Sequence, residues 1–589
     1  MRPLISHPLL VEEEIEARAY QLEAVNTSLD SSTLLVLPTA MGKTAVQWMV
    51  IAETLRSTSG IALLIAPTNA LVDQQYKGLE RVMKLQENET IAKITGSIPP
   101  AKRKGMWDKH RIVVATPQVV RNDAKKEILN LSNVSLLVVD EAHRATGNAA
   151  VAQVGDLLIN ANSDATILGA TASPGWNESS VEEVCEKLHL KGIHVRGSNE
   201  PMLKPYASNL DVEEIRVPVP NELREMARPL ELWLEAIVDR ERRLGHYLRS
   251  GIITIGGLNE AMSRVQQAIA REERMAYRSA GDLGMAIRLY NISNLLVCQG
   301  IAASREAIRR MNERLRQKEK GEKKLREFLE DPRIRNLQND LEKSDEIHSK
   351  VSFTRRVVRQ EISRNPDGRM IIFANYRDTV TAIVSIIEDI PGVNATPFIG
   401  QSSRSGQDGM SHSEQIKRLD AFRKGEYNVL VATSVGEEGL DIPRADLVLF
   451  YEPVGSEIRT IQRRGRTGRH DSGSVYVLIA QGTRDEGATA AAAKREEKML
   501  IAIRRVKHKR HSFTPDLERL STFKVIKENE VIDARDFVVA ERERLREELE
   551  SVDETPIEDE NAESKEEEFP DIPPERRRRR GQSGLEEWY

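Results

Sequence analysis

The sequence predicts an α/β protein in which two parallel-sheet domains flank an all-helical insertion and a disordered tail follows. Short apolar runs alternate with helix-like stretches over residues 1–205, and the same alternation returns after residue 350. The intervening chain is rich in Arg, Glu and Lys and has few strand-like runs. Strands that alternate with helices are typical of parallel sheets covered by helices. Each half is therefore expected to form one such sheet.

The first α/β domain is expected over residues 1–205. Its apolar runs each end at a Pro, a Gly or a polar cluster: Leu34–Pro38, Ala62–Pro67, Arg111–Pro117, Leu136–His143 and Thr166–Ser173. Strands that are buried on both faces have this continuous apolar pattern. Parallel sheets place their functional loops at the carboxyl ends of the strands. The polar residues that follow these runs are therefore the candidates for chemistry.

A helical insertion domain is expected over residues 206–350. The chain from Asn221 to about Gln360 is mostly helix-like, and Ala303–Pro332 predicts a long charged helix with a break near Gly321. A solvated helical connector is the alternative interpretation. The α/β pattern that resumes afterwards favours a folded domain between the two sheets.

The second α/β domain is expected over residues 351–530, with apolar runs at Arg369–Tyr376, Asn428–Ser434, Ala445–Pro453 and Gly473–Ala480. Residues 531–589 are expected to form a disordered tail. Within it, residues 541–575 hold 16 acidic and 4 basic residues and few aromatic ones. Such a composition cannot bury enough apolar surface to fold.

Composition limits the functional classes. The chain of 589 residues has a net charge of −5, but the acidic tail hides a mildly basic folded part that permits a nucleic-acid partner. Cys185 and Cys298 have no disulfide or zinc spacing, which agrees with a reducing compartment. The acidic first thirty residues do not resemble a signal or transit peptide. No apolar run approaches the roughly 18 residues of a membrane span, so we expect no membrane partner and a cytoplasmic location.

The sequence LPTAMGKT predicts a loop that binds the phosphates of a nucleoside triphosphate, ATP being the expected cofactor. A sharp turn from strand to helix would point backbone N–H groups at the phosphates. Lys43 would contact the β and γ phosphates, and the Thr44 hydroxyl would bind Mg²⁺. Leu37 replaces the Gly that usually begins such a loop. The expected nucleotide ligands in this loop are Pro38, Thr39, Ala40, Met41, Gly42, Lys43 and Thr44.

The sequence VVDEAH at Val138–His143 supplies the expected carboxylates. Asp140 ends an apolar strand and is predicted to lie beside Thr44 as a second Mg²⁺ ligand. Glu141 is the predicted general base for the attacking water. An acidic strand end without a partner is the structural alternative. The phosphate loop about a hundred residues upstream favours the catalytic interpretation.

A second basic motif, QRRGRTGR at Gln462–Arg469, is expected to complete the site. Arg466 and Arg469 are three residues apart and would share one helix face. An arginine at the γ phosphate contributes roughly 10³–10⁵ in rate in other phosphoryl-transfer systems. A basic surface helix is the alternative, and the glycines at Gly465 and Gly468 argue against it.

With these motifs the chain resembles the superfamily 2 helicases, whose motor is a pair of RecA-like domains. RAYQ, APTNALVDQQ, ATPQV and TAS carry the resemblance in the first half, and IIFANYRDT and ATSVGEEGLDIP carry it in the second. The resemblance implies further nucleotide contacts by Arg18, Gln21, Gly439, Asp441 and Gln462. It implies nucleic-acid contacts by Thr68, Gly96, Thr116, Asn375 and Thr433. It also implies that hydrolysis is coupled to movement by His143, Thr171 and Ser173.

A narrower resemblance is to the archaeal Hef and eukaryotic FANCM helicases, carried by VDEAHRATGN, GATASPG and VGEEGLDIP. It implies a DNA helicase or translocase that acts on forked or branched DNA in replication-fork repair and recombination, at the nucleoid of a prokaryotic cell. The RIG-I and Dicer helicases share the helical insertion, so a double-stranded RNA-dependent ATPase is the alternative. Hef proteins commonly continue into an XPF-type nuclease domain. No ERKxxxD string is present, so we expect a motor without nuclease activity, with a separate nuclease as a candidate partner.

The sequence QSGLEEWY at the carboxyl end resembles the peptide that binds PCNA-type sliding clamps. Leu585, Trp588 and Tyr589 would enter an apolar pocket from one side of a helical turn, and Gln582 would occupy a polar site beside it. A chance aromatic terminus is the alternative. A clamp-bound scaffold with an inactive motor is the alternative for the whole chain, and the complete set of catalytic residues argues against it.

Overall fold

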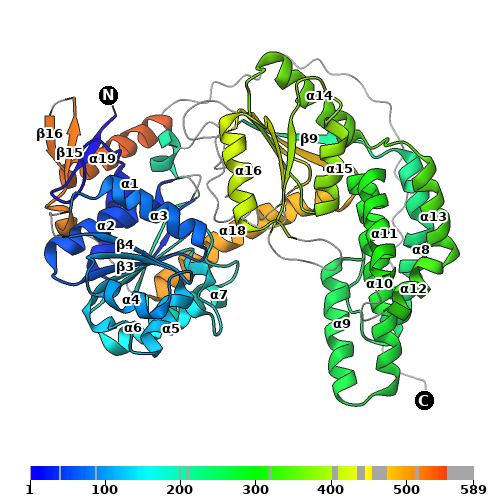
Figure 1. The fold of residues 1–589 in the computed structure, drawn as a ribbon, viewed down its shortest axis with the longest axis horizontal. Helices are drawn as coiled ribbons and strands as arrows, with labels where there is room; N and C mark the ends of the chain where they lie inside the picture. The colour runs from blue at the N-terminus through cyan, green and yellow to red at the C-terminus, as the bar shows by residue number, and fades with distance from the viewer. Residues whose placement is uncertain are drawn as a thin grey trace, which may run out of the picture. The chain divides into compact units, whose positions relative to one another are not determined.

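The structure is a computed structural model that describes residues 2–38, 41–85, 89–197, 200–206, 211–316, 322–400, 409–433, 445–453, 474–510, 516–528 and 530–553. It confirms the predicted α/β class, with two parallel sheets and a helical insertion (Figure 1). The tail predicted to be disordered lies outside the described residues from 554 onward. No helix in the described part of the chain is long and apolar enough to span a membrane.

The first sheet is parallel throughout and has the strand order β4-β5-β3-β6-β7-β2-β8. Its strands are β2 (Thr33–Val36), β3 (Ile61–Ile65), β4 (Ile91–Ile94), β5 (Ile112–Ala115), β6 (Val134–Asp140), β7 (Thr166–Thr171) and β8 (Gly192–Val195). Alternate residues of each strand enter two different cores, as the continuous apolar runs predict. The register pairs Val36 with Thr171 and Asp140 with Ala170, so β2, β7 and β6 end side by side.

Helices cover both faces of this sheet. One core includes side chains of α1 (Ala19–Asp30), α2 (Lys43–Ser57) and α3 (Asn69–Val82). The opposite core includes side chains of four further helices: α4 (Pro100–Trp107), α5 (Pro117–Lys125), α6 (Ala150–Ala161) and α7 (Glu178–Lys187). In such a sheet the loops at the carboxyl ends of the strands are the ones available for ligands.

The second sheet is also parallel and has the order β11-β12-β10-β13-β14-β9. Its strands are β9 (Asp211–Val217), β10 (Met370–Phe373), β11 (Ala395–Phe398), β12 (Val429–Ala432), β13 (Leu447–Phe450) and β14 (Ser474–Ala480). The helices of this domain are α14 (Ser349–Arg364), α15 (Arg377–Ile387), α16 (His412–Lys424) and the first part of α18 (Arg484–Lys509). Strand β9 lies in the range that the sequence predicted to be helical. It is an edge strand with exposed glutamates, so it has no apolar run to mark it.

The helical insertion comprises α8 (Asn221–Arg243), α9 (Ile255–Ala270), α10 (Arg274–Gln299), α11 (Ile301–Arg316), α12 (Glu322–Glu330) and α13 (Pro332–Lys343). Leu230, Leu296 and Phe328 belong to a core of its own. A set of helices that buries its own core is a folded unit, so the solvated-connector alternative is wrong. The predicted long charged helix is described as α11, up to Arg316, and α12, from Glu322, and the predicted break near Gly321 lies outside the described residues.

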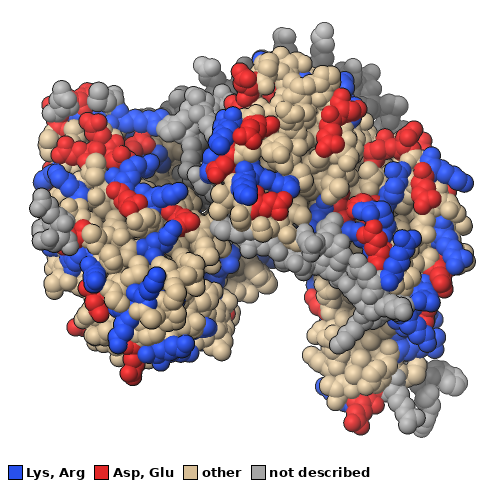
Figure 2. Space-filling view, in the orientation of Figure 1, with Lys and Arg blue, Asp and Glu red and all other residues tan. Residues whose placement is uncertain are grey.

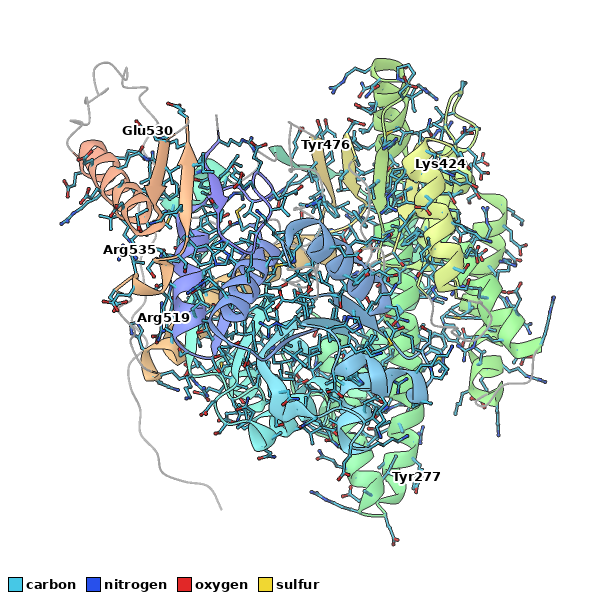
Figure 3. All side chains as sticks on the ribbon, turned by 60° about the vertical axis from the view of Figure 1, so that its left-hand side comes forward. Tyr277, Lys424, Tyr476, Arg519, Glu530 and Arg535 are labelled. Atoms are coloured by element: carbon cyan, nitrogen blue, oxygen red, sulfur yellow. The ribbon has the colours of Figure 1, made fainter. Side chains whose placement is uncertain are left out.

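The last described elements return to the first domain. β15 (Lys524–Lys527) pairs antiparallel with β1 (Leu4–Ser6) and with β16 (Glu530–Asp533). Figure 3 labels Arg519, Glu530 and Arg535, which lie in or next to this part of the chain, beside the amino-terminal strand. Phe523, Val525 and the first turns of α19 (Ala534–Asp553) enter the same core as Ile5. The described chain up to Ala540 therefore closes onto the domain in which it began.

Candidate ATP-binding and hydrolysis site

The phosphate loop is held by the helix that precedes β2. Met41 O accepts hydrogen bonds from Tyr20 Oη at 3.1 Å and from Gln21 Nε2 at 3.0 Å, and both donors lie on α1. Gly42 has a φ of 75°, and a Cβ at this position would lie 2.2 Å from Gln21 Nε2. Only glycine therefore fits where the loop turns into α2. The structure thus brings together Gln21 and Gly42, two residues of the predicted nucleotide site.

Lys43 is the first residue of α2 and lies in the field of both predicted carboxylates. Its Nζ donates to Leu37 O at 3.1 Å. Removal from water lowers the pKa of Lys43, and the nearby charges of Glu141 and Asp140 oppose that shift. The structure thus brings Lys43, Asp140 and Glu141 together, and their catalytic roles stay predictions. Thr44 follows Lys43 in the first turn of the same helix.

The Asp140 carboxylate is fixed by two buried glutamines. Gln47 Nε2 donates to Oδ1 at 3.2 Å, and Gln75 Nε2 donates to Oδ2 at 3.1 Å. Burial, and then the charge of Glu141, raise the pKa of Asp140. A buried carboxylate of raised pKa is one whose charge a bound cation would stabilise. Hard carboxylate and hydroxyl oxygens are ligands that Mg²⁺ prefers alongside substrate phosphates, so Asp140 and Thr44 fit the ion.

Glu141 lies immediately after β6 in a left-handed conformation with a φ of 53°. Burial disfavours its charge, but the close contact with His143 and the nearby Lys43 outweigh burial and lower the pKa of Glu141. The carboxylate is therefore ionised at neutral pH, which is the form that can accept a proton from water.

The three predicted coupling residues are in contact with one another. His143 Nδ1 lies 3.0 Å from Thr171 Oγ1 and 3.3 Å from Glu141 Oε2. The backbone N–H of Ser173 donates to Thr171 Oγ1 at 3.1 Å. The Ser173 hydroxyl contacts Met499 Sδ of α18 at 3.0 Å. A change at Glu141 can therefore reach α18 through a chain of direct contacts.

The predicted nucleic-acid contacts lie at the carboxyl ends of strands in both sheets. Thr68 and Thr116 precede α3 and α5, and Thr68 Oγ1 accepts from Leu71 N at 3.2 Å. Gly96 follows β4 and has open space around its Cα. Asn375 and Thr433 follow β10 and β12, which are neighbouring strands of the second sheet, and Thr433 is buried. The roles of these five residues stay predictions.

Several predicted site residues lie outside the described residues and stay predictions. In the phosphate loop they are Thr39 and Ala40. In the second domain they are Gly439, Asp441, Gln462, Arg466 and Arg469. In the predicted clamp peptide they are Gln582, Leu585, Trp588 and Tyr589.

The sequence analysis missed the residues that support the predicted ligands. Gln47 follows Lys43 by four residues, so the two share a helix face, and this spacing could have identified Gln47. Gln75 lies within the motif APTNALVDQQ but was not predicted to act on Asp140. Tyr206, whose ring lies 4.8 Å from the Arg18 guanidinium, gave no local signal.

The two sheets and this site define the class of ATP-dependent helicases, and comparisons with known proteins agree. Residues 18–181 match the family described as DEAD/DEAH box helicase, and residues 353–471 match the helicase conserved C-terminal domain. The crystal structure of the Pyrococcus furiosus Hef helicase domain is 33% identical, with a TM-score of 0.62 over 81% of this chain and 98% of that one.

Two curated relatives differ in the nucleic acid that their names state. A Methanocaldococcus jannaschii protein, named as a candidate ATP-dependent RNA helicase, is 38% identical over 84% of this chain and 62% of its own length. The Neurospora crassa ATP-dependent DNA helicase mph1 is 30% identical over 80% of this chain and 41% of its own length. The chain thus spans less than two thirds of the length of these relatives.

The chain belongs to the superfamily 2 DEAD/DEAH-box helicases, in the group that contains the Hef helicase domain and its relatives Mph1 and the Fanconi anemia group M protein. The resemblance to this family stated from the motifs is confirmed.

Proposed function

We propose that this chain is a DNA translocase that acts on forked or branched DNA in replication-fork repair and recombination. The observation that carries the proposal is the folded helical insertion within the second α/β domain, between β9 and α14, with its buried core. Figure 2 shows Lys and Arg side chains, interspersed with Asp and Glu, along the α11–α13 side of the insertion. Basic side chains on such a surface are suited to phosphate contacts on a second DNA arm.

The proposed chemistry follows from the described site. Lys43 and the backbone of the loop bind the phosphates of ATP. Thr44 and Asp140 would hold Mg²⁺, which would supply positive charge to the phosphates. Glu141 accepts the proton of the attacking water. Arg466 and Arg469, which lie outside the described residues, would supply positive charge to the transition state. His143, Thr171 and Ser173 pass the change at Glu141 to the rest of the protein.

A double-stranded RNA-dependent ATPase is the second candidate function, because one relative is named for RNA. ATP hydrolysis rates with forked DNA, linear duplex DNA, single-stranded DNA and duplex RNA, measured side by side, separate the two. Forked DNA should give the highest rate. A higher rate with duplex RNA would overturn the DNA proposal.

We further propose that residues 582–589 bind a PCNA-type sliding clamp and that a separate nuclease acts on the remodelled DNA. The clamp proposal is supported by the spacing of Gln582, Leu585, Trp588 and Tyr589. The nuclease proposal is supported by the resemblance to Hef proteins, which commonly join this motor to a nuclease domain. An inactive scaffold is disfavoured because Lys43, Asp140 and Glu141 share one site.

A further inference from the structure

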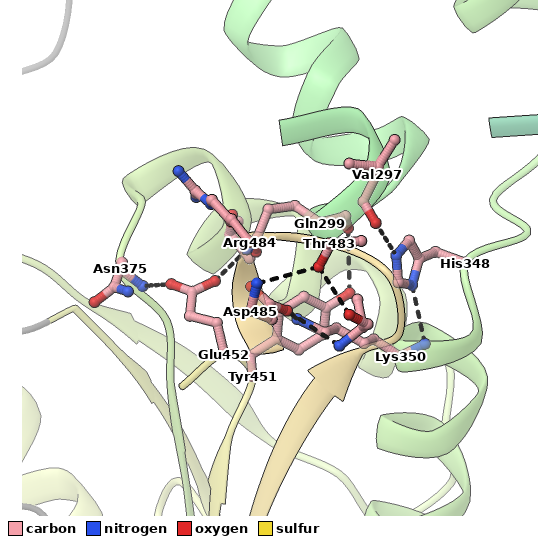
Figure 4. Close-up of polar contacts among 12 residues, drawn as sticks. Val297, Gln299, His348, Lys350, Asn375, Tyr451, Glu452, Thr483, Arg484 and Asp485 are labelled. Carbon is pink, nitrogen blue, oxygen red and sulfur yellow. Dashed lines mark hydrogen bonds and ion pairs between the residues drawn. The ribbon is translucent and has the colours of Figure 1, made fainter. Parts of the chain in front are cut away.

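A buried polar cluster joins the helical insertion to the second α/β domain. The cluster consists of Gln299, Lys350, Tyr451, Glu452 and Asp485, which we call the insertion joint (Figure 4). Its members come from α10, α14, the end of β13 and the start of α18. All but Tyr451 carry amide or charged groups, yet at most 3% of each residue is exposed. Such groups are costly to bury unless they are fully hydrogen-bonded.

Gln299, the last residue of α10, makes three hydrogen bonds to the second domain. Its Nε2 donates to Glu452 Oε2. Its Oε1 accepts from Thr379 Oγ1 of α15 at 3.2 Å, and its backbone oxygen accepts from Tyr451 Oη at 3.2 Å. One residue of the insertion is thus bound to both α15 and the end of β13.

Glu452 connects this residue to a predicted strand-contacting loop. While Oε2 accepts from Gln299, Oε1 accepts from the backbone N–H of Asn375. The neighbouring Tyr376 is partly exposed, and its hydroxyl accepts from Arg484 Nη2 at 2.8 Å. The position of Asn375 and Tyr376 therefore depends on Glu452, which also accepts a hydrogen bond from Gln299 of the insertion.

Further contacts near the loop also join the insertion to the second domain or connect helices beside it. Arg310 of α11 forms an ion pair with Asp378 in the first turn of α15, directly after the loop. His348 Nε2 lies 3.0 Å from Val297 O, which ties the start of α14 to α10. Lys350 Nζ lies 2.6 Å from Asp485 Oδ2, which ties α14 to α18. An apolar interface could slide, whereas directional bonds of this kind fix one arrangement.

We propose that Gln299 and Glu452 are positioning residues that couple the helical insertion to the Asn375–Tyr376 loop, so that DNA engaged by the insertion sets how this loop holds its strand. The inference rests on the proposed function, because it requires that the insertion binds forked DNA and that the Asn375–Tyr376 loop binds one DNA strand. Basal hydrolysis does not require it, since the insertion joint contains none of the predicted ATP ligands.

A reciprocal exchange of the two side chains tests the coupling. Gln299→Glu alone places two carboxylates in contact and removes the donor to Glu452 Oε2. The double variant Gln299→Glu, Glu452→Gln reverses the bond and restores it. In that variant the amide oxygen at position 452 can still accept from Asn375 N, and the carboxylate at position 299 can still accept from Thr379. Glu388→Gln, an exposed change at the end of α15, is the matched control.

The first readout is ATP hydrolysis with forked and with linear duplex DNA. Gln299→Glu should reduce the fork-to-linear ratio of stimulated rates by about 2- to 30-fold, the usual range for mutations that alter coupling between sites. The rate without DNA should stay unchanged. The double variant should recover the ratio, and Glu388→Gln should keep it. An unchanged ratio in Gln299→Glu, or no recovery in the double variant, would overturn the inference.

The second readout needs no DNA and separates this inference from the proposed function. Hydrogen exchange of the peptide that contains Asn375 and Tyr376 should be faster in Gln299→Glu than in the control and slow again in the double variant. Equal exchange in all of them would show that Gln299 does not position the loop. If the unsubstituted chain itself shows no preference for forks, the proposed function fails, and hydrogen exchange still decides whether the insertion holds the loop.

Discussion

Among single residues, Glu141 is the one on which the chemical step should depend most directly. Glu141→Gln keeps the shape of the side chain but removes the group that accepts the proton. Turnover should fall by about 10²–10⁴, the usual contribution of a general base, while ATP affinity is retained. Lys43→Ala should instead weaken ATP binding, because it removes the charge that faces the phosphates. Equilibrium binding and single-turnover hydrolysis separate the two effects, and near-normal hydrolysis in Glu141→Gln would remove the assignment.

Gly42 should be irreplaceable for a different reason. A Cβ there would meet Gln21 Nε2 at 2.2 Å, and the φ of 75° is unfavourable for any other residue. Gly42→Ala should cost about 1–2 kcal/mol from the backbone alone and weaken ATP binding by displacing Gln21. Gly487→Ala, in α18 with open space around it, should be neutral or slightly stabilising. Calorimetry with ATP and thermal melting would check this pair, and equal behaviour of the two variants would contradict it.

A pH dependence follows from Glu53, which attaches α2 to the amino-terminal strand. Burial opposes its charge, but hydrogen bonds with Arg56 and His7 outweigh burial and lower the pKa of Glu53 from 4.5 to about 2. Because the folded-state pKa is depressed, its stabilisation is present above about pH 4.5 and is lost as the pH falls toward 2. After discounting for solvent, it should be worth about 1–2 kcal/mol at neutral pH.

The comparison is between the intact chain and Glu53→Gln. The difference in their thermal midpoints should be largest above pH 5 and should shrink steadily as the pH falls toward 2. A difference that does not change over this range would mean that the Glu53 carboxylate is not selectively stabilised by folding.

At the scale of elements, the helical insertion should set substrate preference rather than hydrolysis. Replacing residues 221–343 by a short Gly/Ser linker cuts between β9 and α14, both of which belong to the second domain. The deletion also removes Gln299, the donor to Glu452. It is therefore combined with Glu452→Gln, so that no buried carboxylate is left without this partner. This variant should retain basal ATP hydrolysis and lose its preference for forks over linear duplex. An unchanged preference would show that the insertion has no role in selecting DNA.

The elements also show which features the sequence could predict. Most strands of the two sheets were visible as local apolar runs, whereas β4, β8, β9 and β11 were not. Lys43, Asp140 and Glu141 followed from motifs at the ends of such runs. The pairing of β15 with β1 was not predictable, because it joins segments about 520 residues apart and short amphipathic strands carry no long-range signal. The bonds of Gln299 to Glu452 were hidden for the same reason: each residue has an ordinary local context, and only the tertiary fold brings them together.

For the whole molecule, the predicted clamp peptide should deliver the motor to replication sites without altering its chemistry. A Leu585→Ala, Trp588→Ala double variant should lose clamp affinity by about thirtyfold or more, because apolar anchors of this kind are hot spots worth about 2 kcal/mol. Its DNA-stimulated ATP hydrolysis without the clamp should be unchanged. Calorimetry with the clamp of the same organism checks this, and equal affinities would mean that these residues are not the binding peptide.

The central claim is that branched DNA, sensed through the helical insertion, drives ATP hydrolysis at Lys43, Asp140 and Glu141. The most direct test is the steady-state hydrolysis rate of the intact chain on a fork and on a linear duplex of equal length and composition, with Glu141→Gln as the blank. The account predicts a higher maximal rate on the fork and no turnover in the blank. Equal rates on the two DNAs, at saturating concentrations of each, would contradict it.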